Sequence, residues 1–589
     1  MVVSTLGRVT VNETPAADTV RDTATGSPFP GTGAAAVTGV SLDASVTTRC
    51  RRRVHLDHDP AVADTPRALP DPSLEQRRAD AREHRDRVGE LIGAAHRDLW
   101  ATVPGDAPAR ERAEATVVAV SAGAGLIWNA QLPRDRAGGR RGGAELLVRV
   151  PGGGYVPVLV VRHRVTDPGQ GARTTPLLEP FPGRARHDPT RKVRSQPRDL
   201  LRLAHLTRML GAAGWAPHDD VATARTGGVV GLDGDVVVWH DLTAEHWPGG
   251  RSTMAEYDAR FADRVSVAVA AATGGPALAL PSRVTECRRC PWWPTCEAEL
   301  ADGQDVSLVV RGESATALRT ANVLTVSQLA AMDPTQEPPV PLPGMAFADT
   351  IALARAWLRG LSVVRRVPAV PVTRADVEVD VDMESFGEAG AYMWGVLLSF
   401  PGGTRDGDQP AGYRAFATWE PVPTDDEARS FAEFWTWITG VRDAARASGR
   451  TFAAYCYNEQ AENRWLLGSA ERFAGKPGIP PIAEVQAFID ADSWVDLFAV
   501  VNEWFLCAHG KGLKRIAPAA GFAWRDAEAG GENSMRWYRD AVALDGGTPD
   551  PLQRTRLLEY NEDDVGATRA LREWMSSPAI ETVPLAADL

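Results

Sequence analysis

The segment at 374–385, RADVEVDVDMES, alternates charged and apolar residues. Side chains of a β-strand point to opposite faces in turn, so the pattern predicts a strand with its acids on one face. The acidic face carries Asp376, Glu378, Asp380, Asp382 and Glu384, and the apolar face carries Val377, Val379, Val381 and Met383. Like charges along one face repel each other unless a cation neutralises them. The segment is therefore either a solvated edge strand or a source of metal ligands.

A second polar group lies near the C-terminus, in LLEYNEDDVGATRALREWM at 557–575. Helical spacing places Tyr560 and Asp564 one turn apart on the same face. Acids near the start of a helix can also be simple partners of its dipole, which is the alternative interpretation. Carboxylates are the ligands that hard divalent cations require, so the two segments together predict a site for Mg²⁺ or Mn²⁺.

A third group consists of cysteines. Cys287, Cys290 and Cys296 form a C-x2-C-x5-C pattern, and Cys50 lies far upstream. Six cysteines in 589 residues do not make a disulfide framework. Four thiolates can bind a zinc ion or a [4Fe–4S] cluster, whereas buried unliganded thiols are the simpler alternative. Cys456, on an expected strand, and Cys507, in an expected apolar helix, are interpreted as core residues.

The length and composition predict a multidomain protein outside the membrane. A chain of 589 residues exceeds a single domain several-fold, and its 44% hydrophobic and 24% charged residues are typical of globular proteins. A net charge of −12 argues against coating nucleic acid by bulk charge but permits a local basic groove. Few cysteines and the absence of a signal-like start favour a cytoplasmic protein, and residues 1–45 are expected to be a mostly disordered tail.

The elements that must position these residues predict an α/β multidomain architecture. In the N-terminal half, helices are expected at 72–100, 199–213 and 254–273, and strands at 116–120, 145–150 and 155–161. Two short helices within 306–335 and a proline-rich linker at 333–344 follow. In the C-terminal half, strands are expected at 374–385, 391–400, 452–457 and 494–498, and helices at 426–448, 458–472 and 553–576.

The C-terminal motifs resemble the YprB-like ribonuclease H-like domain, a branch of the DEDD exonucleases. Asp382 and Glu384 match the first family motif as DME, and Tyr560 and Asp564 match the last as YNEDD. In FAAYCYNEQAENRWL, Asn458 matches the family asparagine, and the third acid falls on Glu462 in place of the usual Asp. WVDLFAVV, with Asp496, and GLKRIAPAAGF, from Gly512, resemble two further family segments.

This resemblance implies a two-metal 3′→5′ exonuclease. The metal ligands would be Asp382, Glu384, Glu462 and Asp564, holding two Mg²⁺ or Mn²⁺ ions, and Tyr560 would orient the attacking water. Nucleic acid, with single-stranded DNA ends preferred, is the implied substrate, and the implied role is repair or defence.

The cysteine layout resembles the iron–sulfur RecB-type nucleases, such as AddB and the CRISPR-associated adaptation nucleases. That resemblance implies a restriction-endonuclease-like core with a [4Fe–4S] cluster on Cys50, Cys287, Cys290 and Cys296, zinc being the alternative. The family's active-site residues are replaced here, by Glu145, by Leu159 and Val161, and by Arg202 and Leu206. The N-terminal nuclease fold is therefore expected to be inactive and to act as a platform, unless Arg162 or His163 compensates.

The whole chain resembles a bacterial family of RecB-like nucleases. The expected boundaries are a tail at 1–45, a RecB-like domain at 46–300, a helical bridge and linker at 301–370, and a ribonuclease H-like domain at 371–589. The bridge resembles a helix-hairpin-helix turning at Gly312, and the basic stretches 134–143 and 184–198 are candidate phosphate contacts. A helicase is the partner suggested by analogy. The alternatives are a non-catalytic nucleic-acid-binding scaffold and an N-terminal nuclease with relocated ligands.

Overall fold

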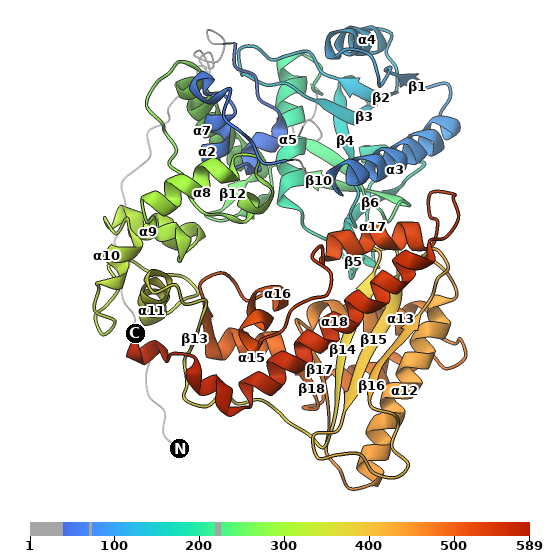
Figure 1. Cartoon of the computed structure of the whole chain (residues 1–589). Helices are drawn as coiled ribbons and strands as arrows, with labels where there is room; N and C mark the ends of the chain where they lie inside the picture. Colours follow the sequence, from blue (N-terminus) through green and yellow to red (C-terminus); the bar gives the residue numbers. More distant parts are fainter. Residues whose placement is uncertain (1–38, 70–72, 218–224) are drawn as a thin grey trace, which may run out of the picture.

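The computed structural model describes residues 39–69, 73–217 and 225–589, which form two α/β units joined by a helical bridge (Figure 1). Most of the predicted tail lies outside the described residues. Val40 and Leu42 are already buried in the N-terminal core, because the chain enters it before the short helix η1 (Ala44–Thr48). The ordered N-terminal unit therefore starts a few residues before 46.

The N-terminal unit is built on an eight-stranded mixed sheet whose order is β1-β2-β3-β4-β9-β10-β6-β7. Its strands are β1 (Trp100–Thr102), β2 (Leu126–Gln131), β3 (Gly143–Arg149), β4 (Tyr155–Val160), β6 (Arg173–Pro176), β7 (Arg186–His187), β9 (Thr226–Val230) and β10 (Val236–Asp241). Helices α5 (Pro197–Ala212) and α7 (Thr253–Ala272) cover one face, where Ile127 and Leu147 point. Helix α3 (Ser73–Ala95) covers the other, where Leu126 and Leu146 point.

The predicted strand at 116–120 is wrong. These residues belong to helix α4 (Ala109–Ser121), in which the apolar run TVVAV continues the charged, helix-favouring stretch ARERAEA. A short apolar run fits a strand and a helix equally well by periodicity, and its flanks decide between them. Val118 is 68% exposed, so this run does not form a buried strand.

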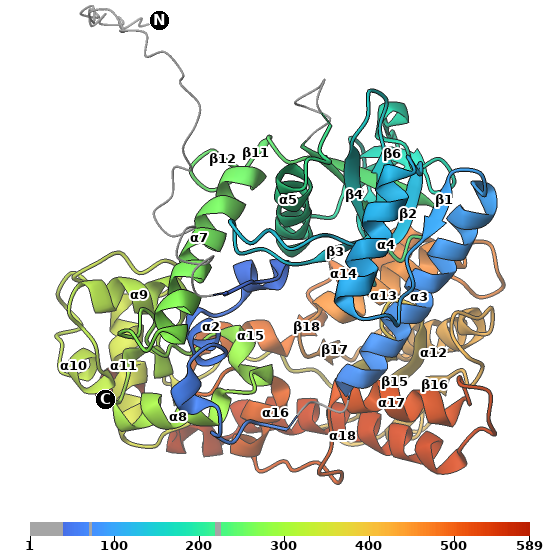
Figure 2. The same cartoon turned by 90° about the horizontal axis from the view of Figure 1, so that it is seen from above.

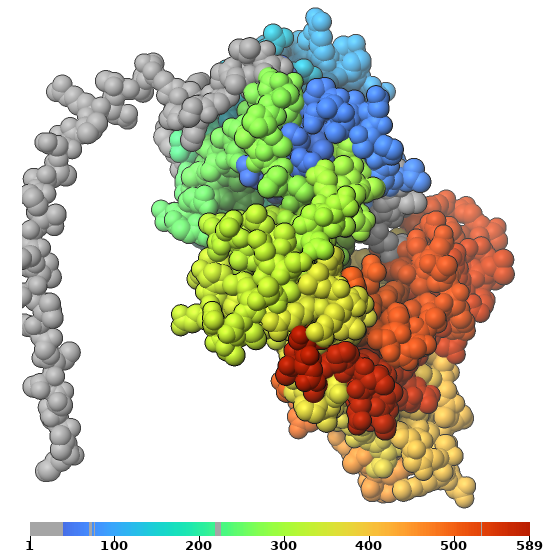
Figure 3. Space-filling model, turned by 60° about the vertical axis from the view of Figure 1, so that its left-hand side comes forward, coloured from blue at the N-terminus to red at the C-terminus, as the bar shows by residue number. Residues whose placement is uncertain are grey.

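The bridge consists of short helices that pack into one core. Its helices are α8 (Trp293–Asp302), η5 (Val306–Leu308), α9 (Gly312–Thr320), α10 (Val326–Ala330) and α11 (Phe347–Leu358). Strand β13 (Val363–Arg365) then pairs antiparallel with β19 (Phe505–Cys507) of the C-terminal unit. Cys507 therefore lies on a strand, and the predicted helix around it is wrong. In Figure 3 the bridge forms one continuous surface between the N-terminal unit and the dark red end of the chain.

The C-terminal unit contains a five-stranded sheet whose order is β16-β15-β14-β17-β18. The strands are β14 (Val377–Ser385), β15 (Ala391–Ser399), β16 (Gly412–Ala417), β17 (Phe452–Cys456) and β18 (Trp494–Asp496). The strand β14 is central, antiparallel to β15 and parallel to β17. The two predicted acidic and apolar faces of the 374–385 segment therefore both lie inside the fold.

Each face of β14 is covered by its own helices. The apolar side chains pack with Phe431 and Ile438 of α12 (Glu427–Ala447) and Leu466 of α13 (Gln460–Arg472). The acidic side lies under α18 (Pro551–Met575), the red helix that crosses the sheet in Figure 1. The interpretation of β14 as a solvated edge strand is therefore wrong.

The acids Glu378 and Asp380 are fully buried and share one cation. Arg572 of α18, itself fully buried, donates to both carboxylates, with 2.6 Å between its Nη2 and Asp380 Oδ2. Arg374 also binds Glu378, with 2.7 Å between Nε and Oε1. These pairs neutralise the repulsion expected along the acidic face and fix α18 on the sheet.

Asp80 joins the N-terminal and C-terminal units through one ion pair and is anchored within the N-terminal unit by another. Asp80 of α3 lies 2.7 Å from Arg162 Nη2, just beyond β4, and 3.2 Å from Arg539 Nη1 of α17 (Gly531–Ala541). Seen from above, α3 extends from the N-terminal sheet toward α17 (Figure 2). One carboxylate therefore holds both units together at this contact.

Replacing Arg572 with Leu should destabilise the protein by about 3–5 kcal/mol, because two buried carboxylates would lose their cation. The midpoint of thermal unfolding, followed by circular dichroism, measures the change. Arg569→Leu is the control, since Arg569 pairs with Glu573 on the exposed side of the same helix and should contribute under about 1 kcal/mol. Equal effects of the two substitutions would contradict the prediction.

Candidate metal centre

Three of the predicted acids converge on one point. Carboxylate oxygens of Asp382, Glu384 and Asp564 all lie within 4.8 Å of one another. Within the described part of the chain, they form the one group of three or more His, Cys, Asp or Glu side chains this close together. Asp382 and Glu384 come from one face of β14, and Asp564 comes from α18, which begins at Pro551. Asp564 thus lies in mid-helix, and its interpretation as a dipole partner in a first turn is wrong.

A close approach of helix to strand brings these acids together. Gly395 faces Asp382 across the β14–β15 pair, and a Cβ atom on Gly395 would lie 1.5 Å from Asn561 Oδ1. The missing side chain lets Asn561 reach Asp382, with 2.7 Å between Nδ2 and Oδ2. Tyr413 fixes the amide orientation by donating to Asn561 Oδ1 over 2.8 Å.

The other two carboxylates have fixed partners as well. Trp524 donates from Nε1 to Asp564 Oδ1 over 2.6 Å, and Ser534 of α17 donates to Glu384 Oε2 over 3.2 Å. Such donors hold ligating carboxylates in orientation while leaving their remaining lone pairs to a cation. The C-terminal site is therefore organised before any metal binds.

Lys514 is the cation nearest this centre. It lies in α16 (Leu513–Ile516), with its Nζ 3.9 Å from Asp564 Oδ1 and 2.8 Å from the hydroxyl oxygen of Tyr560. The ammonium also lies over the Tyr560 ring, 4.3 Å from its centroid. Lys514 thus holds Tyr560 beside Asp564. Lys514 lies in the segment GLKRIAPAAGF, but its role could not be predicted from the motif.

Burial and mutual repulsion shape the protonation of the three acids. Burial raises the pKa of Glu384 to about 8, and the charge on Asp564 adds to this effect. Burial, then Asp564 and Glu384, holds the pKa of Asp382 well above its usual range. The pKa of Asp564 is raised by burial, against the opposing effect of Lys514. One half-buried and two buried carboxylates, whose oxygens lie within 4.8 Å of one another, thus create a site that favours a cation.

The fourth predicted ligand, Glu462, lies near the centre without joining the trio. It is 5% exposed in the first turn of α13, and its Oε2 has no hydrogen-bond partner. Burial raises its pKa to about 8, and its charge contributes to the raised pKa of Asp382. The predicted turn before it is present, since Asn458 adopts a φ of 72° and its N–H donates to Asp496.

The four cysteines of the second predicted site line one small enclosed pocket. Cys50 precedes α2 (Arg51–Leu56), Cys287 lies in η4 (Thr285–Arg289), and Cys290 and Cys296 flank the start of α8. Glu286 ties the two segments together by accepting the Cys50 N–H over 2.6 Å. Burial raises the pKa of Cys296 to about 12.

The spacing of these sulfurs bears on the kind of group that they could hold. Within the described ranges, no three of them lie within 4.8 Å of one another. Four sulfurs bound to one zinc ion through Zn–S bonds of about 2.3 Å would lie closer to one another than 4.8 Å. The four thiols are therefore not arranged as a preformed zinc site.

The N-terminal positions that the RecB-type resemblance assigns to catalysis have other partners. Glu145 lies 2.6 Å from Arg202 Nη2, and Leu159 is fully buried in the core. His163 Nε2 lies 2.7 Å from Asp199 Oδ2, while Arg162 pairs with Asp80. Arg162, His163 and Arg202 line a cavity of about 550 Å³. Asp43, Asp199 and His205 also line it, but among the described residues no three acid or histidine side chains of this cavity come within 4.8 Å of one another.

Several arginines in the basic stretches predicted to contact phosphates have carboxylate partners. In 184–198, Arg191 pairs with Asp235 and Arg194 with Asp167, and in 134–143, Arg140 pairs with Asp135. These arginines stabilise loops rather than present unpaired charge.

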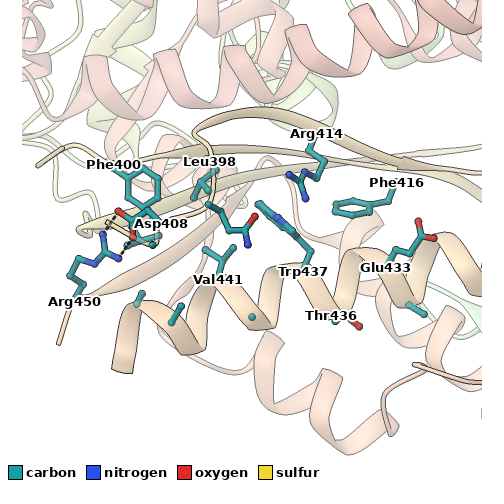
Figure 4. Close-up of a pocket in the computed structure, with 17 residues that line it drawn as sticks. Leu398, Phe400, Asp408, Arg414, Phe416, Glu433, Thr436, Trp437, Val441 and Arg450 are labelled. Atoms are coloured by element: carbon teal, nitrogen blue, oxygen red, sulfur yellow. Dashed lines mark hydrogen bonds and ion pairs between the residues drawn. The ribbon is translucent and has the colours of Figure 1, made fainter. Parts of the chain in front are cut away.

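A cavity of about 690 Å³ opens on the opposite face of the C-terminal sheet, between α12 and β14–β16 (Figure 4). Trp437, Phe400, Phe416 and Arg414 line it, and an ion pair between Asp408 and Arg450 closes one end. The carboxylate trio is absent from its lining. This cavity and the candidate metal centre are therefore two different sites on opposite faces of the sheet.

Replacing Asp564 with Asn should raise the melting temperature of the metal-free protein and abolish its response to Mn²⁺. Removing one of three mutually repelling carboxylates stabilises the fold, whereas the unaltered protein should gain about 2.7 kcal/mol at a ligand concentration of 100 Kd. Differential scanning fluorimetry in EDTA and in Mn²⁺ measures both effects. Glu559→Gln, on the exposed side of α18, is the control and should behave as the unaltered chain.

Comparison with known proteins identifies the C-terminal unit. A family model for the RNase H superfamily matches residues 479–576, which include Lys514, Trp524, Tyr560 and Asp564. Comparison with curated proteins and with solved structures gave no match. In the described residues, no helix is both long and apolar enough to cross a membrane. The C-terminal domain is therefore ribonuclease H-like, as the sequence motifs predicted, and a nuclease-type function is indicated.

Proposed function

We propose that this protein is a metal-dependent 3′→5′ exonuclease that acts on single-stranded DNA ends. The observation that carries the proposal is the convergence of Asp382, Glu384 and Asp564 in a ribonuclease H-like domain. The polarity and the preference for single strands rest on the resemblance to DEDD exonucleases.

Different residues of the chain would bind the metal ions, orient the carboxylates and position the attacking water. Asp382, Glu384 and Asp564 would hold Mg²⁺ or Mn²⁺, and Glu462 has an unpartnered oxygen with which to complete the set. Bound there, such cations would acidify the attacking water and stabilise the negative charge of the leaving oxygen. Asn561 and Trp524 keep their carboxylates oriented. Tyr560, held by Lys514, would orient the attacking water through its hydroxyl.

We also propose that Cys50, Cys287, Cys290 and Cys296 bind a [4Fe–4S] cluster. The support is that four thiols from the two ends of the N-terminal unit share one pocket, with sulfurs spaced more widely than a zinc ion requires. The cluster would then link the two ends of the N-terminal unit to each other. The unit itself would serve as an inactive platform, because Glu145 and His163 are engaged by Arg202 and Asp199.

Asp382→Asn should lower exonuclease activity by more than a hundredfold. Loss of an outer-shell partner of a metal ligand already costs about 10–100-fold, and this change alters a ligand itself. The test is Mn²⁺-dependent digestion of oligonucleotides labelled at either end, with Glu559→Gln as the control. Shortening from the 3′ end is expected.

Other outcomes of this assay separate the rival functions. An intact oligonucleotide at every Mn²⁺ concentration would identify a non-catalytic scaffold. Cleavage that survives Asp382→Asn but is lost in Glu145→Gln would assign the activity to the N-terminal unit.

Anaerobically purified protein should absorb near about 400 nm through its iron–sulfur cluster. Cys290→Ser should remove most of this absorbance and the bound iron, whereas Cys456→Ser should preserve both, because Cys456 lies in the C-terminal core. Bound zinc without the absorbance band would refute the cluster.

A further inference from the structure

Five basic side chains lie near one another, and the neighbouring acid Glu286 pairs with Arg53 rather than with any of them. We call Arg283, Arg288, Arg311, His509 and Arg515 the arginine patch. Within the described ranges, none of them has a carboxylate partner within 4.0 Å, in contrast to the arginines of 184–198. Arg288, Arg311 and Arg515 are exposed. Unpaired positive charge is thus concentrated here.

Three separate parts of the fold build the patch. Arg283 and Arg288 flank the cysteine segment, and Arg311 caps the start of α9 in the bridge. Arg283 is anchored on the bridge, since its N–H donates to Ser307 Oγ over 2.9 Å and its Nη1 to the Leu308 carbonyl over 3.3 Å. His509 follows β19, and Arg515 lies in α16 of the C-terminal unit.

The patch members lie together because the bridge and the C-terminal unit share one core, in which Val310, beside Arg311, and Ala508, beside His509, are both buried. The pKa of Arg311 is lowered by burial and then by Arg283 and Arg288. The pKa of His509 is lowered by burial and then by Arg283, Arg515 and Arg311. Like charges at this proximity oppose each other, and an anion placed among them would relieve the repulsion.

Helix α16 contributes a residue to both the patch and the metal centre. Arg515 follows Lys514 directly, and Lys514 Nζ lies 3.9 Å from Asp564. A single strand whose terminal phosphodiester reached the three carboxylates would therefore meet Lys514 and then Arg515. Beyond them lie His509, Arg311 and the arginines beside the cysteine pocket.

We propose that the arginine patch binds the phosphates of the single strand whose 3′ end occupies the carboxylate centre. The inference rests on the proposed nuclease function and names the surface that holds its substrate. Exposed guanidinium groups bind phosphates without reading bases, so binding should be independent of sequence and sensitive to salt.

The arginines have one competing explanation within the chain. Arg283 and Arg311 are also near Cys287, and they could neutralise thiolates that hold a cluster. Substitutions would then affect iron content and stability rather than nucleic-acid affinity. The experiment therefore has to measure both.

The test compares full-length chains that all carry Asp564→Asn, so that no cleavage interferes. Binding of fluorescein-labelled oligo(dT) in EDTA is followed by fluorescence anisotropy across a salt series. Combining Arg288→Gln, Arg311→Gln and Arg515→Gln should weaken binding at least about tenfold and reduce the slope of log K against log salt by about 2, at roughly 0.7 per phosphate contact. The matching Arg→Lys substitutions should keep most of the slope, because the charges remain.

Arg446→Gln is the matched control. Arg446 is an exposed arginine at the end of α12, it has no acid partner among the described residues, and it lies in a different part of the fold from the patch. Unchanged affinity and slope in the triple Gln variant would overturn the proposal. Loss of affinity together with loss of iron would also overturn it in favour of the competing explanation. Failure of the nuclease function is distinguishable, because the unaltered chain would then bind oligo(dT) through the patch and leave it intact in Mn²⁺.

Discussion

The ion pairs between Arg572 and the buried acids of β14 determine where α18 lies on the sheet. Glu378 and Asp380 cannot be buried without a cation, and Arg572 supplies it from two turns beyond Asp564. Once that end of α18 is fixed, Gly395 allows Asn561 to approach β14, and Asp564 arrives beside Asp382 and Glu384. The same strand thus carries a neutralised pair of acids for packing and an unneutralised pair for binding.

Much of the C-terminal unit could be predicted from the sequence, because strict alternation in β14 identifies both of its faces. The three acids could be predicted from the motifs that lie on this strand and on α18. Lys514 and Trp524 could not be predicted, since their contacts depend on how α16 and the following loop fold back on α18. Glu462 stays a predicted ligand, buried and unpartnered on one oxygen.

The N-terminal half was harder to predict because local patterns there are ambiguous. The apolar run at 116–120 fits a strand or a helix, and α4 is formed because its charged neighbours favour a helix. The apolar residues around Cys507 predict a helix. In the structure this segment is instead the strand β19, because it pairs with β13. For the basic stretches, the sequence shows the charges but not the acids that pair with some of them, so phosphate contact there stays a prediction.

The ion pairs of Asp80 give the N-terminal cavity a mechanical role. Arg162, which lines this cavity, binds Asp80, and Asp80 also binds Arg539 of α17 in the C-terminal unit. The same helix carries Ser534, which donates to Glu384 of the carboxylate trio. A displacement of the cavity wall at Arg162 would therefore pass through one carboxylate to the helix that supports the acidic centre.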